Sequence, residues 1–124
     1  MPARVYICPI EKKSELKKML EYDPYLDPKL GEEDLKKLRE DEMANVIFVR
    51  QDYDLRDGAS INMDPSKCYL FLKAQEGFLE KAEKKLKESI KDIERAPKDI
   101  EEKVIMFIED ERSRADQGFG SIFG

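Results

Sequence analysis

The chemistry of this chain must come from carboxylates, amines, thiols and hydroxyls, because its 124 residues include no histidine. Histidine is the usual general base near neutral pH. Its absence excludes Ser-His-Asp and Cys-His catalytic arrangements, and also zinc sites that use imidazole. A zinc site built from cysteine alone needs four thiolates, and the chain has two cysteines. The sequence therefore predicts no catalytic residue and no cofactor, and it favours a protein that is not an enzyme.

Cys8 and Cys68 are the candidates for thiol chemistry. Two cysteines are too few for the disulfide framework of a small secreted protein. In the topology predicted below, their strands are antiparallel neighbours, so the two thiols could lie near each other. The alternation of side chains assigns them to opposite faces of the sheet, which would prevent a bridge. We therefore expect two free cysteines that behave as small buried apolar side chains.

An acidic segment, Asp52-x-Asp54-x-x-Asp57-Gly58, invites comparison with calcium-binding loops, since hard cations prefer clustered carboxylate oxygens. The EF-hand pattern requires glycine at its sixth position and glutamate at its twelfth. Counted from Asp52, these positions hold Asp57 and Met63. The expectation is a solvated acidic loop and no metal site. If the loop did bind Mg²⁺ or Ca²⁺, then Asp52, Asp54 and Asp57 would be the ligands.

The composition narrows the class of protein and of partner. A formal net charge of −5 argues against a nucleic-acid partner, because phosphate binding depends on positive surface. No apolar run approaches the roughly 18 residues of a membrane span, and no cleavable signal precedes the first apolar segment, so we expect a cytoplasmic protein with no membrane partner. The high content of lysine and glutamate, without tryptophan or histidine, resembles a heat-adapted prokaryotic or archaeal composition.

The hydrophobic pattern predicts alternating strands and helices. Strands are expected at residues 5–8, 45–50 and 68–72, where β-branched and aromatic residues concentrate. Apolar residues spaced three and four apart predict the helices. The first is capped by Ser14 and the second covers residues 32–41; a third runs from Gln75 towards Pro97, and the last covers residues 99–114. The polar stretch at residues 52–66 is expected to be a hairpin connection or a long loop.

This order of elements predicts an α+β fold with a ferredoxin-like βαββαβ sheet and an additional C-terminal helix. Residues 89–95 or residues 104–108 would supply the fourth strand. The first is favoured, because residues 109–114 continue the charged pattern of a helix. We expect a single domain over residues 1–117, followed by an apolar Gly/Phe tail at residues 118–124.

Side-chain alternation in the three strands predicts an aromatic patch on the outward face of the sheet. The patch would contain Tyr6, Phe48, Tyr69 and Phe71, with Arg4 and Arg50 at its edges. Monomers seldom leave a large patch of this kind exposed. It would be covered by the last helix or by a second copy of the chain, or it would serve as a platform for a small ligand or for RNA. The acidic charge balance counts against RNA.

The tail carries Phe119, Ile122 and Phe123 among glycines, which disfavour both helix and strand. These apolar side chains need a surface on which to dock, and they are the predicted partner-binding residues. The expected function is therefore a small interaction or accessory subunit that binds a protein partner, or its own copy, through the sheet face and the tail. One alternative is a ligand-binding or enzyme subunit that uses the aromatic face, and a second is a sheet-face RNA binder.

Overall fold

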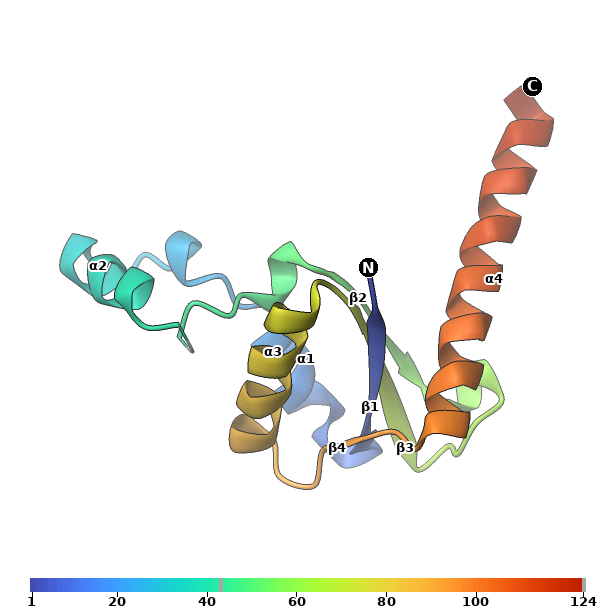
Figure 1. Cartoon of the computed structure of the whole chain (residues 1–124), viewed down its shortest axis with the longest axis horizontal. Coiled ribbons are helices and arrows are strands. Elements are labelled where there is room, and N and C mark those ends of the chain that lie inside the picture. The colour runs from blue at the N-terminus through green and yellow to red at the C-terminus, as the bar shows by residue number, and fades with distance from the viewer. Residues whose placement is uncertain (43, 124) are drawn as a thin grey trace.

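The fold is α+β, with a four-stranded antiparallel sheet and four helices (Figure 1). The computed structural model describes residues 1–42 and 44–123, with the side chains of residues 117–123 left aside. Strands β1 (Ala3–Pro9), β2 (Asp52–Asp57), β3 (Lys67–Lys73) and β4 (Glu94–Arg95) lie in the order β2-β3-β1-β4. The centre of the sheet is the pairing of β1 with β3, which runs from Ala3 opposite Lys73 to Pro9 opposite Lys67. The predicted antiparallel pairing of these two strands is confirmed.

Helices cover both faces of the sheet (Figure 1). Helices α1 (Lys13–Glu21) and α3 (Glu76–Ser89) pack on one face, and α4 (Lys98–Phe123) lies against the other. Helix α2 (Glu32–Glu40) lies away from the sheet. Helix α1 begins one residue before the predicted cap Ser14, and α3 ends before Ile90 and Ile93, which are buried beyond it. The expected fourth strand in residues 89–95 is present as the two residues of β4.

The predicted aromatic patch is wrong for two of its four aromatic residues. Tyr69 and Phe71 share one face, which the last helix covers, but Tyr6 and Phe48 lie on the other face. Tyr6 and Phe48 belong to the core under α1 and α3, whereas Tyr69 and Phe71 lie in the core under α4. The assignment for the first strand was inverted, since Val5 faces α4 and Tyr6 faces α3. Among the described residues, Tyr53 of β2 is the aromatic residue of the sheet that keeps partial contact with solvent, so the predicted four-residue patch is not available to a ligand, to RNA or to a second copy.

The two patch arginines have structural roles. Arg4 is 8% exposed and forms ion pairs with Glu76 and Glu83, which joins β1 to α3. The Nε atom of Arg50 lies 3.0 Å from Oδ2 of Asp23, and its guanidinium lies 4.9 Å from the ring centroid of Tyr25. Arg50 thus holds the segment that follows α1 against the body of the protein.

The second strand lies later in the chain than predicted. Residues 46–48 are a buried connection that ends in a 3-10 turn, Phe48–Arg50, and strand β2 occupies Asp52–Asp57. Val46 and Phe48 enter the core beneath α1 and α3, which explains their hydrophobicity without a strand. Strand β2 is at the edge of the sheet and carries charged residues, which is how natural edge strands avoid further pairing.

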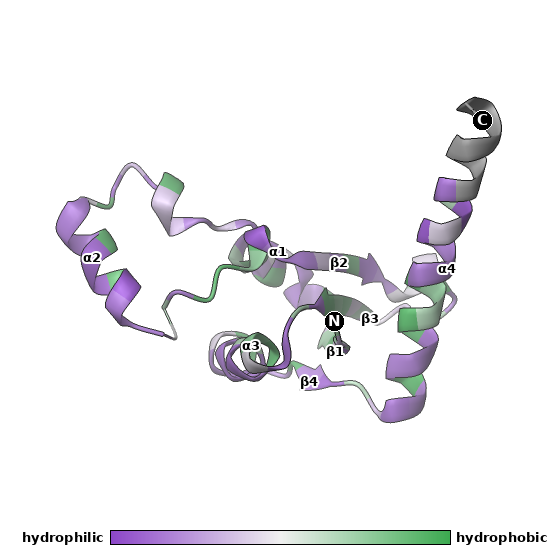
Figure 2. Cartoon of the chain, turned by 45° about the horizontal axis from the view of Figure 1, so that its top comes forward, coloured by the Kyte–Doolittle hydropathy of each residue, from purple (hydrophilic) through white to green (hydrophobic). Residues whose placement is uncertain are grey.

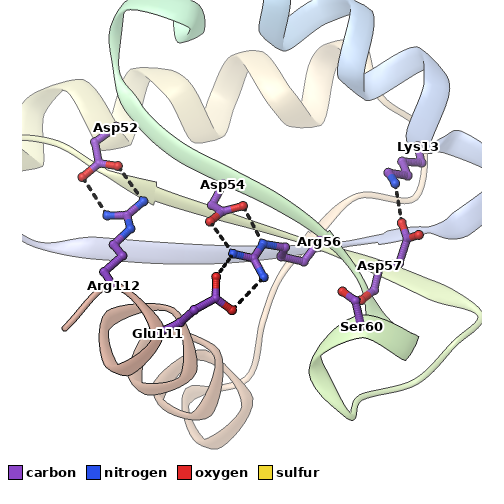
Figure 3. Close-up of polar contacts among 8 residues, drawn as sticks. All are labelled: Lys13, Asp52, Asp54, Arg56, Asp57, Ser60, Glu111 and Arg112. Atoms are coloured by element: carbon purple, nitrogen blue, oxygen red, sulfur yellow. Dashed lines mark hydrogen bonds and ion pairs between the residues drawn. The ribbon is translucent and has the colours of Figure 1, made fainter. Parts of the chain in front are cut away.

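Ion pairs attach α4 to the edge of the sheet (Figure 3). Arg56 of β2 lies between Asp54 and Glu111, and Arg112 pairs with Asp52 at 3.0 Å. The helix continues through the predicted boundary at residue 117 to Phe123, so the expectation that glycine would prevent helix in the tail is wrong for the backbone. Over the described residues, no helix combines the length and the apolar character that a bilayer span requires.

Candidate functional site: an apolar pocket beside the arm

Residues 22–42 and 44–47, which follow α1 in the chain, form an arm that extends away from the sheet (Figure 1). Pro24 and Pro28 end the helical pattern of α1, because proline removes a backbone donor and restricts the residue before it. The arm then turns through α2, which buries none of its residues and is mostly hydrophilic (Figure 2). A helix without a buried face adds little hydrophobic stabilisation, so the arm is held by its two ends, where Pro24, Val46 and Ile47 are buried, and by polar contacts.

A pocket of about 500 Å³ opens where the arm meets α1 and α3. That volume lies within the range of about 300–1,000 Å³ that is typical of small-molecule sites. Its wall is largely apolar and comes from three parts of the chain. The lining residues are Lys18 and Met19 of α1, Tyr22, Pro24, Leu30, Leu38, Ala44 and Val46 of the arm, and Lys85 and Ser89 of α3.

Several apolar side chains of the wall keep partial contact with solvent. Met19, Leu30, Leu38 and Ala44 are half-buried, whereas Val46 at the base is 3% exposed. Covering apolar surface of this kind releases about 25 cal/mol for each Å² removed from water. An apolar ligand in the pocket would therefore cover the half-buried side chains between the arm and helices α1 and α3.

Lys85 of α3 is the less exposed of the two lysines in the wall of the pocket. Its ammonium group donates a hydrogen bond of 2.9 Å to the carbonyl oxygen of Val46, which ties α3 to the arm. Partial burial lowers the pKa of Lys85, and the carboxylate of Asp41 opposes part of this shift. An anionic neighbour stabilises the charged form of a half-buried, desolvated ammonium group.

Lys18 is the second cation of the wall. Its side chain is exposed, and it forms no ion pair with any residue that the structure describes. The chain has 28 acidic residues, yet none of the described residues that line the pocket is acidic. The described residues that line the pocket therefore carry two formal positive charges and no negative charge, in a protein whose net charge is −5.

This arrangement is suited to binding. It offers an apolar wall, two ammonium groups and the hydroxyl of Ser89. The phenol of Tyr22 is engaged elsewhere, because it donates a hydrogen bond of 2.7 Å to Asp27. No carboxylate in the described wall could serve as a general base beside these groups.

The structure separates the three aspartates that were considered as metal ligands (Figure 3). Asp52 pairs with Arg112, Asp54 pairs with Arg56, and Asp57 pairs with Lys13 on the opposite side of the sheet. They lie on strand β2, where the sequence predicted a solvated loop. No group of three or more potential metal ligands occurs among the described residues. The three carboxylates are thus occupied by neighbouring cations.

Cys8 and Cys68 lie directly opposite each other on β1 and β3, so the prediction that they occupy opposite faces is wrong. Both are free and fully buried in the core beneath α1 and α3. Burial raises the pKa of Cys8 to about 12, and the neighbouring thiol of Cys68 contributes to the shift. Burial also raises the pKa of Cys68. The expectation of buried apolar cysteines is confirmed.

We expect both thiols to be inert in the folded protein at neutral pH, because the reactive species is the exposed thiolate. Their reaction with Ellman's reagent should be no faster than unfolding, and denaturant should release two reactive thiols.

Since the pKa of Cys8 rises from 9.0 to about 12 on folding, the thiol of Cys8 loses its proton at a lower pH in the unfolded chain than in the folded protein. The free energy of unfolding should therefore fall as pH rises through this interval. Cys8→Ala should make the decline shallower, and rapid labelling of the native protein would contradict the account.

The predicted partner-binding residues Phe119, Ile122 and Phe123 lie outside the side chains that the structure describes. The pocket itself was not predicted from the sequence. Its residues lie in α1, the arm and α3, and only tertiary structure brings them together. The available signals were the two prolines that redirect the chain after α1 and the leucines of a helix with no buried face.

Similarity to known proteins gives no further assignment. No family model matches the chain, and neither a curated protein nor a solved structure is detectably similar to it. The inference of function rests on the pocket formed by α1, the arm and α3.

Proposed function

We propose that this protein is a small binding domain that holds a largely apolar small molecule in the pocket between α1, the arm and α3. One observation carries the proposal. Half-buried apolar side chains on facing elements enclose about 500 Å³ that the chain does not fill. Largely apolar pockets of this size with a few polar groups are the usual form of a ligand site.

A neutral apolar probe tests this function. Decanol should raise the melting temperature of the protein, because a ligand that binds the folded state stabilises it. Ala44→Phe should abolish the shift by filling the pocket. Ala115→Phe makes the same change on the exposed surface of α4 and should leave the shift unchanged. A decanol shift that survives in Ala44→Phe would show that the pocket is not the site.

A second candidate function is docking of a protein partner, or of a second copy, at the C-terminal end of α4. Among the residues whose side chains the structure describes, the ion pairs from α4 to the sheet end at Arg112, whereas the helix extends to Phe123. The sequence of this extension contains Phe119, Ile122 and Phe123. For self-association, the full chain should show a concentration-dependent mass in solution, and a chain truncated after Asp116 should remain monomeric. Equal masses for both would remove self-association through this end.

We also infer a ferredoxin-like arrangement for the sheet and its helices. The chain order is strand, helices, strand, strand, helix and strand, and the spatial order is β2-β3-β1-β4 with antiparallel neighbours. This order supports the inference. Helices α2 and α4 are additions to the ferredoxin-like unit. A fold of this kind does not itself assign a function.

A further inference from the structure

We propose that the ligand of this pocket is an amphipathic anion, with an apolar body against the arm and α1 and a carboxylate held by Lys18 and Lys85. The inference rests on the binding function proposed above and specifies its ligand class. It rests on the distribution of charge in and around the pocket, and the closing experiment separates it from the more general claim.

The described wall of the pocket lacks acidic residues. Acidic side chains outnumber basic ones in the chain, 28 to 23, yet the described wall contains two lysines and no carboxylate. Lysine acts as a compact point charge for carboxylates and phosphates. A pocket of this sign attracts anions and repels cations.

Lys18 has no counterion among the described residues, although other lysines of the same region do. Lys17 pairs with Glu21 within α1, and Lys13 pairs with Asp57 of β2. Lys18 instead stands beside Met19 at the wall of the pocket. Its ammonium group is therefore available to a bound anion.

Lys85 is half-buried and donates to a neutral carbonyl oxygen. Asp41 is the acidic residue that acts on it, and Asp41 lines an adjoining groove of the arm that shares three of its apolar lining residues with this pocket. A carboxylate inside the pocket would stabilise the charged form of Lys85 and offset its desolvation.

The apolar residues of the wall determine which kind of ligand body fits beside the head group. Met19, Leu30, Leu38 and Val46 offer no hydrogen bonds to a sugar or to a nucleobase, and an inorganic anion would leave them uncovered. An alkyl or aryl body fits them, and a single head group matches the two lysines. The ligand class is a medium-length fatty carboxylate or an aryl carboxylate of similar size.

Three probes that share one alkyl chain and differ in their head group test the inference: decanoate, decanol and decylamine. Affinities are measured by calorimetry with the full chain, below the concentrations at which the probes form micelles. We expect decanoate to bind at least about tenfold more tightly than decanol, since a hydrogen bond to a charged group contributes about 1.5–3 kcal/mol. Decylamine should bind most weakly.

Charge-removing variants locate the head group. Lys18→Met and Lys85→Met keep an apolar side chain of similar length and should each weaken decanoate about tenfold more than they weaken decanol. Lys84→Met is the control, because Lys84 is exposed on α3 outside the pocket. The melting temperature of each variant shows that it is folded.

The outcomes separate the two claims. If decanol binds as tightly as decanoate, or if Lys18→Met and Lys85→Met leave decanoate affinity unchanged, the anionic ligand class is wrong and the pocket remains a site for neutral molecules. If no probe binds, the proposed binding function is wrong as well. Tight binding of decylamine would also contradict the inference.

Discussion

Replacing Phe71 with alanine is expected to lower the free energy of unfolding by about 3–5 kcal/mol, the usual cost of removing a buried aromatic side chain. Phe71 is completely buried on β3, where it packs with Val5, Val104 and Ile108 beneath α4. The guanidinium of Arg112 lies 5.0 Å from the centroid of its ring and would lose that contact too. Urea unfolding should show a lower midpoint with an unchanged slope.

Met106→Ala is the matched control for this change. Met106 lies on the same helix that covers Phe71, but it is 72% exposed. Its substitution should change the stability by no more than about 0.5 kcal/mol. Equal effects of the two substitutions would contradict the placement of α4 over this face of the sheet.

Gly58→Ala is expected to destabilise the protein by about 3 kcal/mol or more, at the upper end of the overpacking range. Gly58 begins the 3-10 turn Gly58–Ile61 that follows β2, and it is buried. A Cβ atom built on it would lie 1.8 Å from the carbonyl oxygen of Asp64 and 2.6 Å from its carbonyl carbon. Both atoms belong to the backbone, so the loop between β2 and β3 would have to move.

Gly77→Ala provides the comparison, because a Cβ at this position of α3 meets no atom within 4 Å. Alanine is a better helix former than glycine, so this variant should be more stable by about 0.5 kcal/mol. Thermal unfolding of both variants checks the pair. A Gly58→Ala protein as stable as the parent would show that the loop does not approach β2 as described.

The sequence predicted most of the elements because their hydrophobic periods were unambiguous. Residues 68–72 became the centre of β3, and the apolar stripe beginning at Phe78 became the buried face of α3. The charged pattern after residue 109 correctly continued the last helix. Turn signals at Asp57-Gly58 and Asp64-Pro65 mark the two ends of the loop between β2 and β3.

The second strand could not be placed by hydrophobicity alone. Val46 and Phe48 are apolar because they pack in the core beneath α1 and α3. Their segment therefore has the composition of a strand without being one. Strand β2 alternates charged residues with Tyr53 and Leu55, which is the pattern of a half-buried strand, but its four charged residues favoured a loop. Its charges are compensated by partners on α4 and α1, distant in the sequence. This compensation appears only in the folded structure.

The candidate site was missed for a related reason. An aromatic patch was inferred from alternation in isolated strands, but the first strand was assigned to the wrong face and the second to the wrong residues. The pocket instead depends on how the arm folds back beside α1 and α3. Neither Lys18 nor Lys85 differs in sequence context from the other surface lysines. The role proposed for them follows from their position, since both line the same pocket.

An amide chemical-shift titration of the unmodified protein with decanoate tests the central claim most directly. We expect saturable changes concentrated at the pocket, at residues such as Met19, Leu38, Ala44, Val46 and Lys85. Amides of α4 and of the loop between β2 and β3 should remain unaffected. Changes that are absent, or that concentrate on α4, would contradict the account.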